Sequence, residues 1–350
     1  MSDLTFDFSR YPYLSADLSG TGGRIRSEPQ DFQVEEVPAY TPSGEGEHLY
    51  LFIEKEGLTT RAVFEFIRDT LAVPEAGIGV AGLKDKRALT RQWISIPAKY
   101  EARVSRLEEL PGVRILEQGL HSNKLRVGHL RGNRFKILIR DASEDARSRA
   151  EAVLRRLEAQ GVPNYFGPQR FGIGGLNPQK GYELVTRGKG RGAPWLKKFL
   201  IASLQSLLFN DWLALRLGLG LYAQVVRGDV AKKHDSGGEF LVEDPQLENP
   251  RAARLEISAM GPLYGKRYFE AEGEARALED QILERYRLRR EQFAARKGAR
   301  RVIRFPLGEW AVSEAPEGIW VSFFLPKGAY ATAVLREVMK TNPDAGEIED

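Results

Sequence analysis

The sequence predicts an α+β protein in which a mostly helical block interrupts a sheet-containing body. Apolar residues alternate with the strand period of two in segments before residue 141 and again after residue 299, and helical periodicity dominates the stretch between them. Of the 350 residues, 42% are hydrophobic, and a chain of this length forms two domains more readily than one. We therefore expect one body built from residues 1–160 and 305–350, interrupted by an inserted domain at residues 161–304.

The N-terminal part of this body is expected to combine short strands with two helices. Phe32 and Val34 mark a first strand after a proline-centred turn. Thr59 and Thr60 offer hydroxyl N-caps for a helix that ends before Pro74. The other expected elements are strands at 48–54, 78–83, 93–96, 124–130 and 135–140, and a helix at 144–160.

The inserted block is expected to be helical and to begin at Gly161. Residues 161–175 are rich in glycine and aromatic residues and show neither period, and residues 221–265 are punctuated by glycine and read as irregular. Pro194 suits the first turn of one long helix, and Gly298 closes a second. The predicted elements are helices at 194–217, 271–297 and 331–340, and strands at 300–305, 310–314 and 319–325.

The composition excludes several kinds of chemistry. The chain has no cysteine, which rules out disulfides, thiol nucleophiles and cysteine-bound metals. No two of its four histidines have the spacing of a helical metal site, so we expect no metal and no cofactor. The N-terminus lacks a signal-peptide pattern, and the longest apolar run, 199–209, is too short to cross a bilayer. We expect a cytoplasmic protein with no membrane partner.

The basic residues are unevenly distributed. The net charge is only +4, but residues 161–304 carry 25 Lys and Arg against 16 Asp and Glu, whereas the rest of the chain carries 27 against 32. A basic domain attached to a near-neutral one is typical of a nucleic-acid-docking surface beside a catalytic body. The composition alone leaves open that the arginine-rich helices are simply solvated faces.

One carboxylate, Asp85, lies in a strongly basic loop. Lys84, Lys86, Arg87 and Arg91 surround it in sequence, and such cations favour the ionised form that a nucleophile or base requires. An exposed turn with mixed charges is the alternative, and the residues alone leave both readings open. Residues 77–82 match G-x-G-x-x-G, but a helix precedes them and a strand follows, so we expect no dinucleotide site.

Aromatic and amide side chains stand near the expected strand ends. Gly132 and Asn133 are expected to form the turn of a hairpin, with the Asn133 amide free to face a base edge and Phe135 offering a stacking surface. Phe32 and Tyr330 also flank element boundaries, where stacking on a base is open but the residues alone favour packing in the core.

Together these features resemble the tRNA pseudouridine synthase D (TruD) family over nearly the whole chain. The motifs that carry the resemblance are Gly20-Thr-Gly, Glu28-Pro-Gln-Asp-Phe32, Gly44-Glu-Gly-Glu-His48, Gly82-Leu-Lys-Asp-Lys86, Thr90-Arg-Gln-Trp93, Gly132-Asn-Arg-Phe135, the run from Val162 to Gly172, and Leu325-Pro-Lys-Gly-Ala-Tyr-Ala-Thr332. The resemblance implies the pseudouridine synthase fold, a mixed sheet with flanking helices, interrupted by the family's own mostly helical domain.

The resemblance also implies roles for individual residues. Asp85 takes the position of the catalytic aspartate. Phe32, Asn133 and Tyr330 take substrate-contacting positions, and Phe135 takes the position that stacks on the target uracil. Tyr330 departs from the pattern, because bacterial members often carry Phe there.

Two cations complete the expected site. Arg26 stands where some relatives carry Lys, and either residue could meet a phosphate. Lys84 is expected to bind substrate. A cation at Lys84 or Lys86, or one from elsewhere in the fold, is expected to keep the carboxylate of Asp85 charged.

The implied substrate is uridine 13 in the D-arm of tRNA. Isomerisation to pseudouridine breaks the N1–C1′ bond, rotates the uracil and joins C5 to C1′, so it is redox-neutral and requires no cofactor. The base must be flipped out of its stack. Asp85 could add at C1′, remove a ribose proton or add at C6, and the sequence does not choose among these. We expect the protein to act as a monomer.

Two functions of other classes remain open. A base-excising glycosylase also flips a base and can use a carboxylate at C1′, and it would release free uracil. A non-catalytic RNA chaperone on the same scaffold would remodel tRNA without needing the carboxylate of Asp85.

Overall fold

The computed structural model describes residues 4–188 and 193–342, and the chain divides into two compact units. The sheet unit comprises Thr21–Glu151 and Leu307–Ala331. The helical unit comprises Ala152–Pro306 together with the two chain ends, up to Gly20 and from Thr332.

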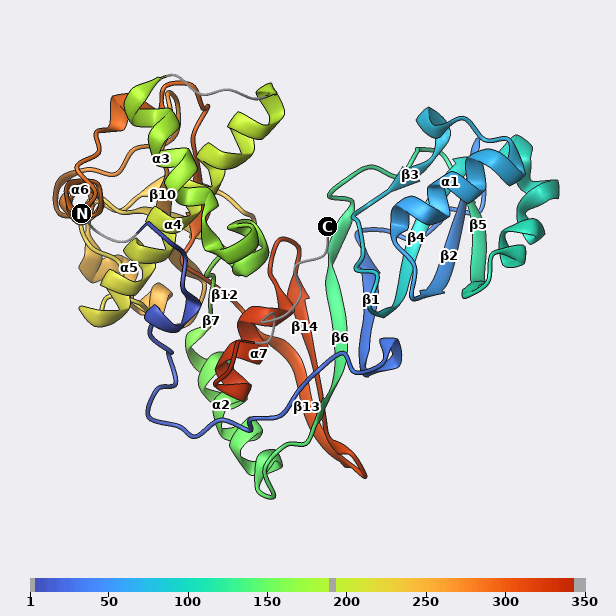
Figure 1. Cartoon of the computed structure of the whole chain (residues 1–350), viewed down its shortest axis with the longest axis horizontal. Helices are drawn as coiled ribbons and strands as arrows, with labels where there is room; N and C mark the ends of the chain where they lie inside the picture. The colour runs from blue at the N-terminus through green and yellow to red at the C-terminus, as the bar shows by residue number, and fades with distance from the viewer. Residues whose placement is uncertain (1–3, 189–192, 343–350) are drawn as a thin grey trace. The chain divides into compact units, whose positions relative to one another are not determined.

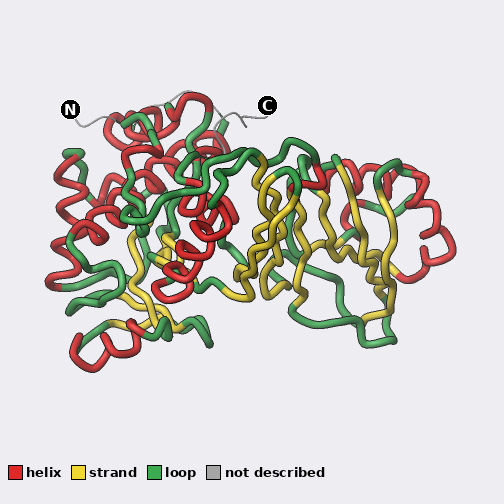
Figure 2. The backbone as a smooth tube through the Cα atoms, turned by 90° about the horizontal axis from the view of Figure 1, so that it is seen from below, coloured by secondary structure: helices red, strands yellow, loops and turns green. Residues whose placement is uncertain are grey.

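The sheet unit is built around eight strands in the order β13-β14-β6-β1-β4-β2-β5, with β3 paired to β4 (Figure 1). Figure 2 shows the strands of this unit in yellow. The pair β1–β4 is parallel and every other pair is antiparallel, so the sheet is mixed. The strands are β1 (Phe32–Pro38), β2 (His48–Glu56), β3 (Gly79–Val80), β4 (Leu89–Pro97), β5 (Val113–His121), β6 (Leu130–Arg140), β13 (Gly308–Ala315) and β14 (Gly318–Pro326). The predicted α+β class is confirmed.

Helix α1 (Thr60–Leu71) packs on one face of this sheet. Thr59 caps it by accepting a hydrogen bond from the Ala62 amide, as the hydroxyl pattern predicts. Its buried apolar positions are Val63, Ile67 and Leu71, spaced as one helical face. They join a core with alternate residues of β2 and β4, namely Leu49, Leu51, Ile53, Ile94 and Ile96. The 3₁₀ segment Ala98–Glu109 adds Val104 and Leu107 to this core.

The predicted hairpin turn at Gly132 and Asn133 is wrong. Strand β6 runs without a break from Leu130 to Arg140, and Asn133 pairs with Glu36 on one side and Leu325 on the other. The glycine serves close strand packing instead of a turn, because a Cβ at residue 132 would overlap the carbonyl oxygen of Leu325. The loop before β4 lies earlier in the chain than expected and spans residues 81–88, because β3 ends at Val80 and β4 begins at Leu89.

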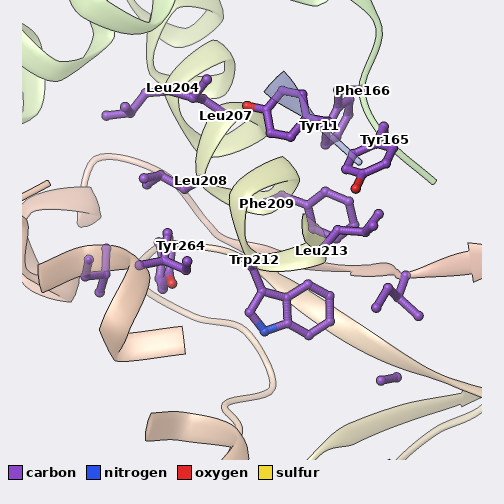
Figure 3. Close-up of a cluster of buried hydrophobic side chains, with 14 of the residues drawn as sticks. Tyr11, Tyr165, Phe166, Leu204, Leu207, Leu208, Phe209, Trp212, Leu213 and Tyr264 are labelled. Atoms are coloured by element: carbon purple, nitrogen blue, oxygen red, sulfur yellow. The ribbon is translucent and has the colours of Figure 1, made fainter. Parts of the chain in front are cut away.

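The helical unit forms around α4 (Pro194–Gly218), which begins at a proline as predicted. Its buried residues, including Leu204, Leu208, Phe209 and Trp212, form the centre of the largest hydrophobic core (Figure 3). The other helices are α3 (Asn177–Arg187), α5 (Pro245–Ala253), α6 (Gly273–Arg285) and α7 (Ala331–Met339), and α2 (Ala146–Gln160) spans the sequence boundary between the units.

Two predictions for this unit need correction. Residues 221–265 are not irregular, since they contain α5 and most of a four-stranded sheet ordered β11-β10-β8-β9. These strands are β8 (Val230–Lys233), β9 (Glu239–Leu241), β10 (Ile257–Leu263) and β11 (Ala299–Val302), beside the short pair β7 (Val162–Pro163) and β12 (Arg304–Phe305).

The second correction concerns the helix expected at 271–297. Helix α6 ends at Arg285, and the chain turns at Arg287, whose φ of 54° is left-handed. The turn buries Leu288 and brings the Arg290 guanidinium to Glu279 and Asp280, so tertiary contacts end the helix early.

The chain ends join the helical unit, unlike in the predicted domain division. On α7, Arg336 donates to the Phe8 carbonyl, and the carboxylate of Glu337 accepts from the amide and hydroxyl of Ser15. The predicted assignment of catalysis to residues 1–160 and 305–350, and of tRNA docking to 161–304, stays a prediction.

Candidate active site

The register of the sheet aligns polar side chains on the face that α1 covers. Lys55 pairs with Thr90 between β2 and β4, and Glu36 pairs with Asn133 between β1 and β6. Because side chains alternate along a strand, Gln92 lies on the same face as Thr90. We call this set the polar row; its members are Lys55, Thr90, Gln92, Glu36 and Asn133. The first four are buried, which is costly for polar groups unless they are hydrogen-bonded.

The first residues of the 81–88 loop are hydrogen-bonded to the polar row and to helix α1. The Gln92 amide nitrogen donates to the Gly82 carbonyl at 3.4 Å, and the backbone N–H of Lys84 donates to the Thr60 hydroxyl at 3.0 Å. That hydroxyl in turn donates to the Gln92 carbonyl oxygen at 3.1 Å. The loop is therefore fixed by buried partners and is not a free turn.

Lys55 attaches the same loop at Asp85. Its ammonium donates to the backbone carbonyl of Asp85 at 2.9 Å and to that of Leu58 at 2.6 Å. Burial lowers the pKa of Lys55 to about 8, and the negative charge of Asp85 opposes this shift. A buried cation thus sits directly behind the aspartate.

The carboxylate of Asp85 points out of the loop and meets the guanidinium of Arg26. Its Oδ2 lies 3.2 Å from a guanidinium nitrogen of Arg26, whose side chain is 6% exposed, while that of Asp85 is 57% exposed. Arg26 has a left-handed φ of 58°, and its guanidinium lies 4.2 Å above the Phe32 ring in a cation–π contact. The carboxylate is therefore oriented by a buried partner and still accessible.

Lys84 does not point to solvent, although it lies in the same loop. Its ammonium lies 3.0 Å from the Glu36 carboxylate and donates to the Asn133 side-chain oxygen at 2.9 Å. The other carboxylate oxygen of Glu36 accepts from the Trp93 backbone amide at 3.3 Å. Burial raises the pKa of Glu36, and the nearby Lys84 charge opposes the rise.

Two of the aromatic candidates, Phe32 and Phe135, lie on the same face and are buried. Phe32 meets Phe135 edge-on at 6.2 Å between ring centroids, and Phe135 lies 5.5 Å from Phe323. One face of the Phe32 ring is covered by Arg26. Tyr330 is 53% exposed and follows β14, which leaves the sheet beside Asn133.

The structure thus brings most of the predicted site residues into one connected set in the sheet unit. Asp85, Arg26, Phe32 and Phe135 form a chain of contacts, and Lys84 and Asn133 join it through the loop. Within residues 4–188 and 193–342, no three His, Asp or Glu side chains are grouped so that they could hold a metal ion. No helix in that part of the chain is long and apolar enough to cross a membrane.

Residues 10–188 and 191–338 match the family model described as tRNA pseudouridine synthase D (TruD). The chain belongs to this family. A tRNA pseudouridine synthase D from Thermus thermophilus is 69% identical over 338 residues, covering 97% of this chain and 94% of that protein. The protein of the same name from an Anaeromyxobacter species is 43% identical over 349 residues, covering 97% and 99%.

A solved structure assigned to the TruD family, from Methanosarcina mazei, shares the fold. Its TM-score is 0.78, with 23% sequence identity and 97% of each chain covered. The likeness extends over both units, and it confirms the pseudouridine synthase D fold expected from the motifs.

Sequence reasoning missed the buried part of this candidate site, namely Lys55, Glu36, Thr60 and Gln92. The sequence carried a signal for two of these residues, Lys55 and Glu36. Lys55 continues the buried series Leu49, Leu51 and Ile53, and Glu36 continues the buried series of Phe32 and Val34. A charged residue in the apolar phase of a strand marks a buried ion pair or a functional position.

Proposed function

We propose that this chain is a tRNA pseudouridine synthase that isomerises uridine 13 in the D-arm of tRNA, with Asp85 as its catalytic nucleophile or base. Membership of the TruD family supports the reaction class. The observation that carries the proposal is the placement of Asp85, whose accessible carboxylate is oriented by Arg26 on a loop held by Lys55 and Lys84. A reacting carboxylate needs both access and a fixed direction.

The chemistry requires the target nucleotide to leave its stack, because its C1′ is otherwise out of reach of the enzyme. Asp85 would then act at the ribose, by adding at C1′ or by removing a ribose proton, or at C6 of the uracil. Each path breaks the N1–C1′ bond, keeps the uracil bound while it rotates, and forms the C5–C1′ bond. The guanidinium of Arg26 would balance the charge on Asp85 before the reaction and hold its carboxylate in one orientation through Oδ2.

Substrate binding is proposed to use the surroundings of Asp85. Phe135 and Tyr330 would supply aromatic surfaces, and Asn133 would hydrogen-bond the base. Since Arg26 lies over the Phe32 ring, Phe32 would act by supporting Arg26 as well as by contacting substrate. Arg26 and Lys84 would contribute positive charge. The basic segment 161–304 would hold the tRNA backbone, and we propose a cytoplasmic monomer that requires no cofactor.

The test is Asp85→Asn, which keeps the size of the side chain but removes its nucleophilic charge. Pseudouridine formation in transcribed tRNA, read by carbodiimide-probed primer extension, should fall by about 10⁴-fold or more, as when an essential catalytic group is removed. The affinity for tRNA should change little. Asp69→Asn, an exposed carboxylate on α1, serves as the matched control and should retain full activity.

The outcomes separate the competing functions. Full turnover by Asp85→Asn would remove Asp85 from the mechanism, and a modified position other than 13 would overturn the substrate assignment. Release of free uracil by the wild type would identify a glycosylase. Equal remodelling of tRNA by wild type and Asp85→Asn, with no pseudouridine formed, would identify a chaperone.

A further inference from the structure

We infer that Lys84 is a positioning residue that fixes the side-chain amide of Asn133, so that its NH2 group is an obligate donor to a carbonyl oxygen of the target uracil. The inference rests on the proposed function and assigns Lys84 a role exerted through Asn133 and not by direct contact with the substrate.

The direction of the Asn133 amide follows from the chemistry of its neighbour. The Lys84 ammonium lies 2.9 Å from the Asn133 Oδ1 atom, and an ammonium can only donate hydrogen bonds. Rotating the amide by half a turn would bring its NH2 group against the ammonium, donor facing donor. The carbonyl oxygen must therefore face Lys84, and Nδ2 must face the other way.

The Lys84 ammonium is itself held in place by a buried carboxylate. Glu36 lies 3.0 Å from it with a fully buried side chain, and the second oxygen of Glu36 is occupied by the Trp93 amide. The backbone of Lys84 is tied to the Thr60 hydroxyl. Removing one member of a buried pair leaves an uncompensated charge. Moving the Lys84 ammonium away from Glu36 would therefore be energetically costly.

The sheet makes the arrangement rigid. Glu36 and Asn133 are directly opposite each other in the β1–β6 ladder, where paired side chains share one face of the sheet. Lys84 bridges these two strand-held side chains from the loop that carries Asp85. The donor on Asn133 and the carboxylate of the adjacent Asp85 are thus set by the same short segment of chain.

The amide donor has no protein acceptor in the described part of the chain. The side-chain oxygen of Asn133 accepts a hydrogen bond from the Lys84 ammonium. Its Nδ2 makes no hydrogen bond to another described residue, and it is not one of the fully buried atoms that lack a partner. An accessible NH2 group, held by the residue next to the proposed catalytic carboxylate in the chain, fits a uracil carbonyl oxygen, which can only accept.

A double-mutant cycle tests whether Lys84 acts through Asn133. Lys84→Met should lower the single-turnover rate of pseudouridine formation by roughly 10- to 100-fold, the cost of a misdirected hydrogen bond in a desolvated site. In an Asn133→Ala background the same substitution should lower it by less than about 3-fold, because the group it positions is already gone. The tRNA dissociation constant is measured for each variant, and the rates are compared at saturating enzyme so that weaker binding does not enter the cycle.

The inference is overturned if Lys84→Met lowers the rate equally in both backgrounds, since Lys84 would then act independently of Asn133. If Lys84→Met leaves Glu36 unpaired and the protein unfolds, the cycle is run in Glu36→Gln, which keeps an acceptor for the Trp93 amide and removes the buried negative charge. An inactive wild type would contradict the proposed function, whereas an active wild type with an additive cycle contradicts only this inference.

Asn133→Asp is an independent test of the donor group on Asn133. The carboxylate preserves the acceptor that faces Lys84 but offers no donor on its other side. Its rate should fall at least as far as that of Asn133→Ala. A variant as active as the wild type would show that the NH2 group is not the contact with the base.

Discussion

Lys55 shows how a single buried residue can support the loop that carries Asp85. Its ammonium is removed from water and bonded to the carbonyl oxygens of Leu58 and Asp85, which are neutral acceptors. Burial therefore disfavours its charge and lowers the pKa to about 8. A methionine would fill the space at a lower electrostatic cost, so a lysine at this position indicates that its bonds to the loop matter.

This shift makes the stability of the protein depend on pH in a defined window. The pKa of Lys55 is about 8 in the folded chain and 10.5 in an ordinary environment, so between these values the unfolded chain binds the additional proton. The contribution of Lys55 to the free energy of unfolding should rise with pH from about 8 to 10.5, by on the order of 2–3 kcal/mol. Urea unfolding of the wild type and Lys55→Met across this range measures the contribution as a difference.

The control for this prediction is Lys86→Met, which changes an exposed lysine in the same loop. Its unfolding free energy should follow the pH dependence of the wild type. Identical curves for Lys55→Met and the wild type would show that Lys55 does not titrate in this window.

Strand β6 is the element on which the site depends most. It lies between β1 and β14 and carries Asn133 and Phe135 into the candidate site. Glycine at position 132 lets β6 pack closely against β14, because the Leu325 carbonyl and the Phe324 ring occupy the space that a Cβ would need. A hairpin at this point would have removed Asn133 from its pairing with Glu36, and so from Lys84.

Gly132→Ala should therefore destabilise the protein by about 1–3 kcal/mol, the usual cost of overpacking a tight site, and should reduce activity because Asn133 moves with it. Gly308→Ala in β13 is the matched control, since a Cβ there meets Phe324 at an ordinary contact distance. Thermal unfolding of both variants measures the difference. Equal stability of the two would show that β14 does not approach β6 as closely as described.

The distribution of charge over the whole molecule suggests where a polyanion would bind. The segment 161–304 is the basic part of the sequence, but its cations are not equivalent in the structure. Arg290 forms ion pairs with Glu279 and Asp280, and its side chain is only 13% exposed. Arg287 and Arg289 are exposed in the same turn. Only exposed cations can exchange counterions for phosphates.

Neutralising Arg287 and Arg289 to Gln should weaken tRNA binding and reduce its dependence on KCl concentration, by roughly one unit of slope for each phosphate that is no longer neutralised. Arg290→Gln should instead lower the melting temperature, because it leaves Glu279 with less compensation for its buried charge. Fluorescence anisotropy titrations over a series of salt concentrations give the slope. If affinity and slope match the wild type, these two arginines form a solvated surface.

Local chemistry in the sequence determined much of this protein. The N-cap at Thr59, the proline at the start of α4 and the alternation in β2 and β14 predict elements that the structure confirms, because each depends on residues close in the chain. The family motifs around Asp85 likewise depend only on the order of residues. They identified the family and drew attention to the loop that the structure places in the candidate site.

Only the tertiary structure decided how that loop is held. A period of two reveals which residues share a face, but not which strand pairs with which, and the polar row exists because β1 pairs with both β4 and β6. The same limit explains Gly132 and Asn133, whose turn chemistry was outweighed by pairing to β14, a strand from the far end of the sequence. The burial of Lys55 and Glu36, and hence the direction of Asn133, follows from contacts that no local pattern contains.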